Sequence, residues 1–363
     1  LYWGDSMSYD AGGYVLAQTW TGEAFVTTSG QTMVSGYGFH YFVAFIYYFF
    51  GRNQLLVQFI NGTISASAAL VIYSTARDLY GPAPARWALL FMSFFPQMVF
   101  WSCAMYKDPS ILLCIAISIH SVLRLRDRFS GWSLLLFVAA TLALMTLRFY
   151  VFYMVAFAAV GTFLFSQRRG LLGGLAGQAV LAIVFFSAVT LGVRRETIDQ
   201  QAQYFDLEKL QNARLDQSMR GQSAFASQID VSTREGVAAA IPIGLVYLLF
   251  APFPWSISGV RQLLTLPETL VWYALMPALL RGLIVTVRTR FRDALPMLVF
   301  AATLTLAYAA FQSNVGTAYR QRTQITMFFF ILIGVGIEHK RMSRAPDPAR
   351  AVRPRVAVDR QPS

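Results

Sequence analysis

Residues 131–167 read GWSLLLFVAATLALMTLRFYVFYMVAFAAVGTFLFSQ, an apolar stretch in which Arg148 is the only charged residue. A helix that crosses a bilayer needs about 20 consecutive, mostly apolar residues. The stretch is long enough for two crossings, 131–147 and 149–167, with Arg148 at the turn between them. It therefore predicts a membrane hairpin, and the rest of the chain extends the same pattern.

The composition agrees with an integral membrane protein. Of 363 residues, 56% are hydrophobic and only 13% are charged, whereas charged residues make up about 25% of a typical soluble domain. We expect an all-α integral membrane protein, a multi-span helical bundle with about nine spans in this sequence. The apolar runs lie at 55–76, 87–105, 109–124, 131–147, 149–167, 174–193, 267–287, 294–312 and 325–338.

The net charge of +12 reflects topology. The basic residues gather in short loops between alternate apolar runs and in the C-terminal tail, and such loops face the cytoplasm in membrane proteins. Nucleic-acid binding would not explain this placement. The opposite, outer side would then carry residues 1–54, the turns at Lys107 and Arg148, and the loop 194–236.

The organisation along the chain follows from this assignment. We expect one transmembrane domain over 1–343, with 1–54 as its first extracytoplasmic loop and 194–236 as an extracytoplasmic polar loop. The tail 344–363 is rich in Pro and Arg without an apolar period, which predicts disorder. Since the sequence opens on Leu1 in a polar stretch, an N-terminal transmembrane helix is expected to be missing.

Two apolar segments do not suit a simple crossing. Residues 237–255 contain Pro242, Pro252 and Pro254, and a crossing there would reverse the sidedness of all that follows. We expect a re-entrant or interfacial segment on the outer face. Residues 36–50 are short and aromatic, which predicts an interfacial helix on the same face.

The acidic residues of YWGDSMSYD, Asp5 and Asp10, are the first candidate site residues. Carboxylates at the rim of an apolar bundle are costly unless they hold a cation, a proton or a substrate. Solvated loop carboxylates are the alternative interpretation. Nothing in the chain has the His and Cys spacing of a zinc site, and a divalent cation is left open.

Basic residues on the outer side oppose the topological trend and so require a reason. Lys107, Arg148, Arg320 and Arg322 are suited to bind a lipid phosphate or pyrophosphate. Structural alternatives exist, since Lys107 can pair with its neighbour and Arg148 can extend to headgroups. The outer candidates for substrate binding are Lys107, Asp108, Arg148, Asn314, Arg320 and Arg322.

Four stretches together resemble the GT-C superfamily of polytopic glycosyltransferases, in particular bacterial members of the dolichyl-phosphate-mannose and aminoarabinose transferase types. They are GDSMSYDAGGYVLA, QFINGTISASAALVIYSTARDLYG, FFPQMVFWSCAMYKDPSILL and NVGTAYRQRTQITMFFFILIG. The first looks like the acidic motif of the first extracytoplasmic loop. Two departures stand out: no adjacent Asp-Asp or Asp-Glu pair occurs in it, and no large soluble C-terminal domain follows.

The resemblance implies a reaction and its partners. The donor would be a sugar on a polyprenyl phosphate, and the acceptor an extracytoplasmic glycan, lipid or protein of the cell envelope. The implied place is the bacterial inner membrane, with the site on the periplasmic side. In an inverting displacement Asp5 would be the general base, while Asp10 orients the acceptor or helps a cation. Lys107, Arg320 and Arg322 would bind the lipid phosphate.

Two other functions remain open from the sequence. A polymerase or ligase of lipid-linked oligosaccharides would rely on Arg and His more than on Asp5. A lipid or sugar transporter, such as a flippase, would need charged residues at mid-membrane or broken helices in matching halves. Neither feature is found in the apolar runs.

Overall fold

The computed structural model describes residues 5–22, 37–165, 207–220, 224–225, 229–256, 263 and 265–344. In these parts every named element is helical, which confirms the all-α prediction. The predicted span 174–193, residues 194–206 of the polar loop and the tail from 345 onward lie outside the described residues.

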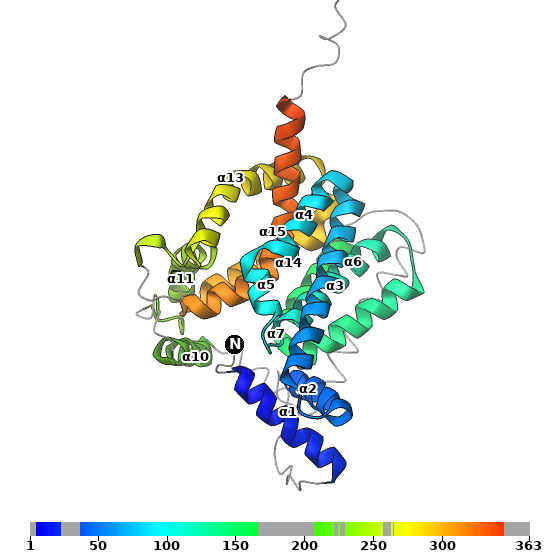
Figure 1. The fold of residues 1–363 in the computed structure, drawn as a ribbon. Helices are drawn as coiled ribbons and strands as arrows, with labels where there is room; N and C mark the ends of the chain where they lie inside the picture. Colours follow the sequence, from blue (N-terminus) through cyan, green and yellow to red (C-terminus); the bar gives the residue numbers. More distant parts are fainter. Residues whose placement is uncertain are drawn as a thin grey trace, which may run out of the picture.

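The helices are, in chain order, α1 (Asp5–Thr21), α2 (Gly38–Phe50), α3 (Gln54–Tyr80), α4 (Pro82–Phe94), α5 (Pro96–Ser102), α6 (Asp108–Asp127), α7 (Gly131–Phe165), α10 (Leu207–Arg220), α11 (Arg234–Phe250), the 3-10 turn η2 (Pro254–Ser256), α13 (Leu266–Thr289), α14 (Phe291–Phe311) and α15 (Val315–Arg344). Figure 1 shows α3, α4, α6, α7, α14 and α15 packed together, with α1 and α2 below them. Five of those described, namely α3, α6, α7, α13 and α14, are long and apolar enough to cross a membrane. This confirms a polytopic membrane protein.

Three of the predicted spans take a form that the sequence analysis did not anticipate. The run 87–105 divides into α4 and α5, because Phe95 is extended (φ −67°, ψ 123°) ahead of Pro96. A residue before proline is disfavoured in the helical region, which explains the break. The two predicted spans around Arg148 are the arms of α7, which is interrupted by the non-helical backbone of Arg148 (φ −158°, ψ 84°).

The bundle has two distinct ends. Arg148 lies beside Asp108 at the start of α6, so the first arm of α7 runs back along the helix that precedes it. At the other end of α6, Arg126 donates to the backbone carbonyl oxygens of Arg292 and Asp293 at the start of α14. We call these the Asp108 end and the basic end. The basic end carries Arg77, Arg124, Arg126, Arg128, Arg288, Arg290, Arg292, Lys340, Arg341 and Arg344.

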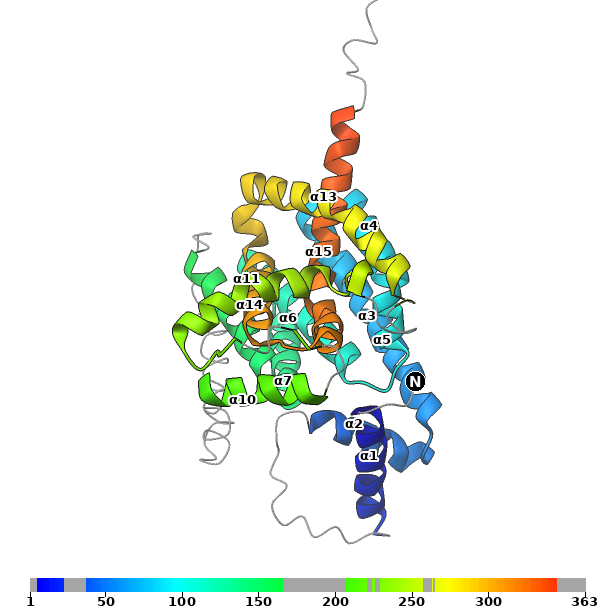
Figure 2. The same cartoon turned by 90° about the vertical axis from the view of Figure 1, so that its left-hand side faces the viewer.

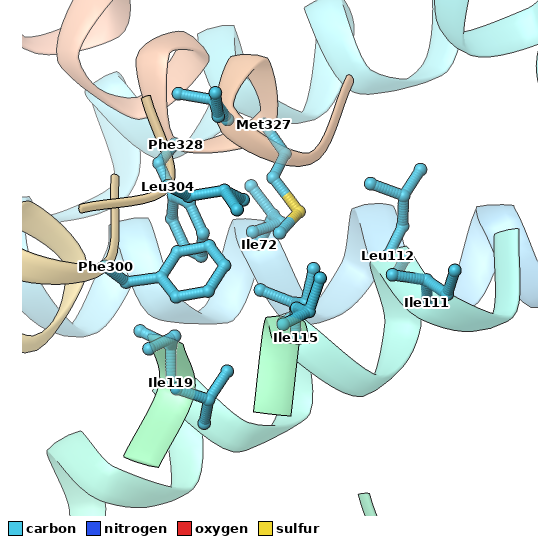
Figure 3. Close-up of a cluster of buried hydrophobic side chains, with 14 of the residues drawn as sticks. Ile72, Ile111, Leu112, Ile115, Ile119, Phe300, Leu304, Met327 and Phe328 are labelled. Carbon is cyan, nitrogen blue, oxygen red and sulfur yellow. The ribbon is translucent and has the colours of Figure 1, made fainter. Parts of the chain in front are cut away.

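The apolar core runs through most of the described helices, and one part of it lies between α3, α6, α14 and α15. Figure 3 shows Ile72 of α3 and Ile115 of α6 facing Phe300 of α14 and Phe328 of α15, all of them buried. In addition, α13 and α15 approach closely, since a side chain at Gly336 would collide with the carbonyl group of Ala278. Such small residues let membrane helices pack backbone to backbone.

The N-terminal helices lie beyond the Asp108 end, with the first residues of α1 directed at the bundle (Figures 1 and 2). The stretch treated as a polar loop is thus helical in 5–21. Tyr9, Gly13 and Ala17 form its buried stripe, and a side chain at Gly13 would collide with Val43 of α2. Close contact with α2 accounts for a helix that propensity alone does not predict.

The two segments expected to be interfacial are helices. In α2 the aromatic residues Phe45, Phe49 and Phe50 are exposed, as a helix lying in a membrane surface requires. Residues 234–250 form α11, which contains Pro242 and packs against α14. Their re-entrant or interfacial position stays a prediction.

Candidate functional site

Five of the predicted residues meet at the Asp108 end, although they come from four parts of the chain. Asp5 lies in the first turn of α1, Lys107 and Asp108 at the start of α6, Arg148 at the break in α7, and Arg320 near the start of α15. We call this set the Arg320 cluster.

Arg320 is the centre of the cluster because it pairs with two acids. Its Nη1 lies 3.0 Å from Asp5 Oδ2, and its Nε lies 2.9 Å from Asp108 Oδ2. The second oxygen of Asp108 lies 3.6 Å from Nη2 of Arg148. The side chain of Asp108 is 0% exposed and that of Asp5 is 56% exposed. Asp108 is therefore the inner anchor, and Asp5 is the carboxylate that a ligand can reach.

The local sequence explains why Asp108 lies at the start of α6, within the Arg320 cluster. Pro109 stands in the first turn, where its missing N–H costs nothing, and Asp108 lies at the positive end of the helix dipole. The non-helical residue Arg148 ends the first arm of α7 opposite this turn. The turn before α6 and the break in α7 thus bring Asp108 and Arg148 together at the Asp108 end of the bundle.

Lys107 is the basic group of the cluster that is left for a ligand. No described residue forms an ion pair or hydrogen bond with its ammonium group. Burial, together with the positive charges of Arg148 and Arg320, lowers the pKa of Lys107 to about 8. An anion that binds here would stabilise the charged ammonium more than it would stabilise an exposed one.

Aromatic side chains that the sequence analysis did not single out form one wall of the cluster. The guanidinium of Arg320 lies 4.6 Å from the ring centre of Tyr106 and 5.8 Å from that of Trp101. The buried indole N–H of Trp101 has no acceptor among the described residues. Tyr9, one helical turn after Asp5, is also buried, and burial with the nearby Asp5 raises its pKa. Trp101 and Tyr106 precede Lys107 closely in the sequence, and Tyr9 follows Asp5. This proximity is the sequence signal that could have identified them.

The charges of the cluster do not cancel. Lys107, Arg148 and Arg320 stand against Asp5 and Asp108, which leaves one positive charge in excess. Arg320 is held between aromatic rings and carboxylates with its side chain 16% exposed. This arrangement suits an anion with several oxygens, such as a phosphate, next to a reachable carboxylate.

Asp10 lies outside the cluster. Residues five apart on a helix point about 140° away from each other, and Asp10 faces α2 while Asp5 faces α15. Its buried carboxylate accepts a 2.6 Å hydrogen bond from the hydroxyl of Tyr47 and pairs with Arg52. These contacts fasten α1 to α2 and to the connection before α3.

Arg322 and Asn314 also lie apart from the Arg320 cluster. Arg322 is buried and donates to the carbonyl oxygens of Leu249 at 3.0 Å and Ala251 at 3.2 Å, at the end of α11. Its guanidinium stacks over Trp272, 5.3 Å from the ring centre. Asn314 accepts a hydrogen bond from the backbone N–H of Thr317 and so caps α15. Within the described residues, no group of three or more His, Cys, Asp or Glu side chains could hold a metal ion.

The chain matches a family model and resembles a solved structure. Residues 35–191 match the family model described as dolichyl-phosphate-mannose-protein mannosyltransferase. This part contains Lys107, Asp108 and Arg148 and ends before Arg320. No curated protein matches the sequence.

Among solved structures, the chain resembles the crystal structure of ArnT from Cupriavidus metallidurans bound to undecaprenyl phosphate. The TM-score is 0.53 at 14% sequence identity. The match covers 91% of this chain and 55% of that chain, so this sequence spans about half the length of that protein. At this identity the likeness concerns the fold.

Proposed function

We propose that this chain, whose fold resembles that of ArnT and whose residues 35–191 match the mannosyltransferase family model, transfers a sugar from a polyprenyl-phosphate donor. The acceptor would be a glycan, lipid or protein on the extracytoplasmic side of a bacterial inner membrane. The observation that carries the proposal is the Arg320 cluster, where a reachable carboxylate lies beside surplus basic groups.

In this proposal the donor phosphate binds between Lys107 and Arg320. Lys107 supplies an ammonium that no described residue neutralises, and Arg320 supplies a planar guanidinium with several N–H donors. The prenyl chain would extend from there along the exposed aromatic side chains of α2. Asp108 and Arg148 act as positioning residues in this arrangement, because their ion pair holds the start of α6 beneath Arg320.

Asp5 would act as the general base in a single inverting displacement. The acceptor hydroxyl oxygen attacks the anomeric carbon while its proton passes to the Asp5 carboxylate. The bond from this carbon to the lipid-phosphate oxygen breaks, and the phosphate keeps the electron pair. Lys107 and Arg320 stabilise the charge that grows on that leaving oxygen.

The shared position of Arg320 suggests how base and donor are coupled. Before the donor binds, Arg320 holds Asp5 in an ion pair at 3.0 Å. A phosphate that engages Arg320 competes with Asp5 for the same N–H groups. The Asp5 carboxylate would then be released from Arg320, so that its oxygens can accept the proton of the acceptor hydroxyl.

The remaining predicted residues receive supporting roles. Asp10 would hold α1 in place through Tyr47 and Arg52, so that Asp5 meets Arg320. Arg322 and Asn314 would fix the start of α15, which carries Arg320. The predicted contacts of Asp10, Asn314 and Arg322 with substrate stay hypotheses.

The function is tested by transfer from a panel of radiolabelled polyprenyl-phosphate sugars. Membranes would contain the full-length protein or its Asp5→Ala variant. We expect label to move into an envelope glycan, lipid or protein with the unsubstituted protein and not with the variant. Equal transfer by both would remove Asp5 from the mechanism. Donor binding without transfer to any acceptor, in both proteins, would contradict the transferase and favour a transporter.

A further inference from the structure

A groove of about 580 Å³ opens on α13 at the basic end, far from the Arg320 cluster. Its lining combines apolar side chains, among them Leu280 and Ile284, with the side chains of Arg281, Arg288 and His339. His339 comes from α15, which packs along α13. The groove therefore joins an apolar surface to basic groups.

The two arginines lie on one face of α13. Positions 281 and 288 are seven residues apart, which is about two helical turns, and Ile284 lies between them on the same face. Arg281 precedes the end of α13 at Thr289 by eight residues, or about 12 Å. In a membrane crossed by α13, the side chain of Arg281 would start beside the lipid tails and extend toward the headgroups for a polar partner.

No described residue forms an ion pair with Arg281 or Arg288. Glu338, the residue before the lining residue His339 in α15, is already engaged. Glu338 accepts a 2.7 Å hydrogen bond from the indole N–H of Trp87 and lies 3.0 Å from Arg341. The positive charge of the groove is consequently left for a group that is not part of the described protein.

The outer wall of α13 is suited to lipid tails. Only 22% of its apolar segment is buried in the protein, less than in the other four candidate spans. Leu280, Leu283, Ile284 and Val287 are all exposed there. An occupant of the groove would therefore combine an anionic head with an apolar chain that continues along this wall.

We propose that the groove binds an anionic phospholipid of the leaflet at the basic end. Its phosphate would lie between Arg281 and Arg288, with His339 as a further donor, and one acyl chain would follow Leu280 and Ile284. Arginine forks suit phosphate oxygens, and each basic group near an anionic membrane surface favours binding. The site is independent of the sugar-transfer reaction and would anchor the junction of α13 and α15.

The test counts lipids that remain bound to the purified protein. Protein released from nanodiscs of phosphatidylethanolamine and phosphatidylglycerol would be studied by native mass spectrometry. We expect retained phosphatidylglycerol, reduced at least tenfold in the double variant Arg281→Gln/Arg288→Gln. The matched control is Arg86→Gln/Arg292→Gln, which removes two exposed arginines of the same end outside the groove. Equal retention in both double variants would overturn the proposal.

A second measurement needs no substitution. A phosphatidylglycerol with a photoreactive acyl chain should label residues 277–289 of the unsubstituted protein. Excess phosphatidylglycerol should suppress that label, and excess phosphatidylcholine should not. Suppression by both lipids alike would show general lipid contact and contradict the proposal.

Discussion

Arg320 and Arg322 stand two residues apart on α15, yet their charges are neutralised in different ways. Arg320 pairs with the carboxylates of Asp5 and Asp108, whereas Arg322 donates to backbone carbonyl oxygens near the end of α11. Side chains two positions apart on a helix differ by about 200° in direction. Arg320 and Arg322 therefore point to nearly opposite faces of α15. A phosphate can displace a carboxylate from Arg320, but the carbonyl groups around Arg322 belong to a packed backbone. The first arginine is suited to a ligand and the second to stability.

The largest expected effect is the loss of the base. Asp5→Asn should reduce kcat by about 10²–10⁴, as removal of a general base does, with little change in thermal stability because the side chain is more than half exposed. Asp10→Asn is the matched control on the same helix. It should lower the Tm, because the Asp10 carboxylate is buried, while kcat per folded molecule stays well above that of Asp5→Asn. The reverse order of activities would make Asp10 the base.

The second largest effect is expected from Arg320→Gln, which tests whether Arg320 binds the donor phosphate. Arg320→Gln should lower kcat by about 10²–10³, the usual cost of removing a group that stabilises the developing charge. It should also raise the KM for the donor, since the same group binds the phosphate in the ground state. Steady-state kinetics with a synthetic donor would measure both. An unchanged KM with an unchanged kcat would exclude Arg320 from the phosphate site.

A pH profile tests Lys107. Burial and two neighbouring guanidinium groups place its pKa at about 8, so the ammonium is charged below that pH and neutral above it. Donor affinity should therefore fall as the pH rises through 8, with KM increasing up to about tenfold per pH unit beyond it. In Lys107→Arg the charge persists and the rise should disappear. A KM independent of pH from 7 to 10 in the unsubstituted protein would contradict this role.

The smallest effect on activity is expected at Arg322. Arg322→Met removes the donor from three carbonyl groups, which should cost about 2–3 kcal/mol of stability. Folded molecules that survive should keep kcat far closer to normal than Arg320→Gln does. Thermal unfolding in detergent and kinetics on the same samples would measure the two quantities. A loss of kcat as large as that of Arg320→Gln, at unchanged Tm, would erase the distinction between the two arginines.

Much of the site could be predicted from the sequence because charge is so unusual in this chain. Asp5, Lys107, Asp108, Arg148 and Arg320 were singled out as polar residues at the ends of apolar runs, and all five meet. The same reasoning also selected Asp10, Arg322 and Asn314, to which the structure gives internal partners. Trp101 and Tyr106 were missed, because aromatic residues are common throughout such a chain.

The sequence by itself indicated a helical protein with several membrane spans and its resemblance to the GT-C glycosyltransferases. Both depend on hydropathy over about 20 neighbouring residues, and this local property needs no knowledge of packing. Only the tertiary structure decided which charges share a site. Asp5 and Arg320 are 315 residues apart in the chain, and the direction of each side chain depends on how its helix is rotated against its neighbours. A difference of two residues on α15, or of five on α1, then separates a charge of the Arg320 cluster from a buried charge with partners elsewhere in the fold.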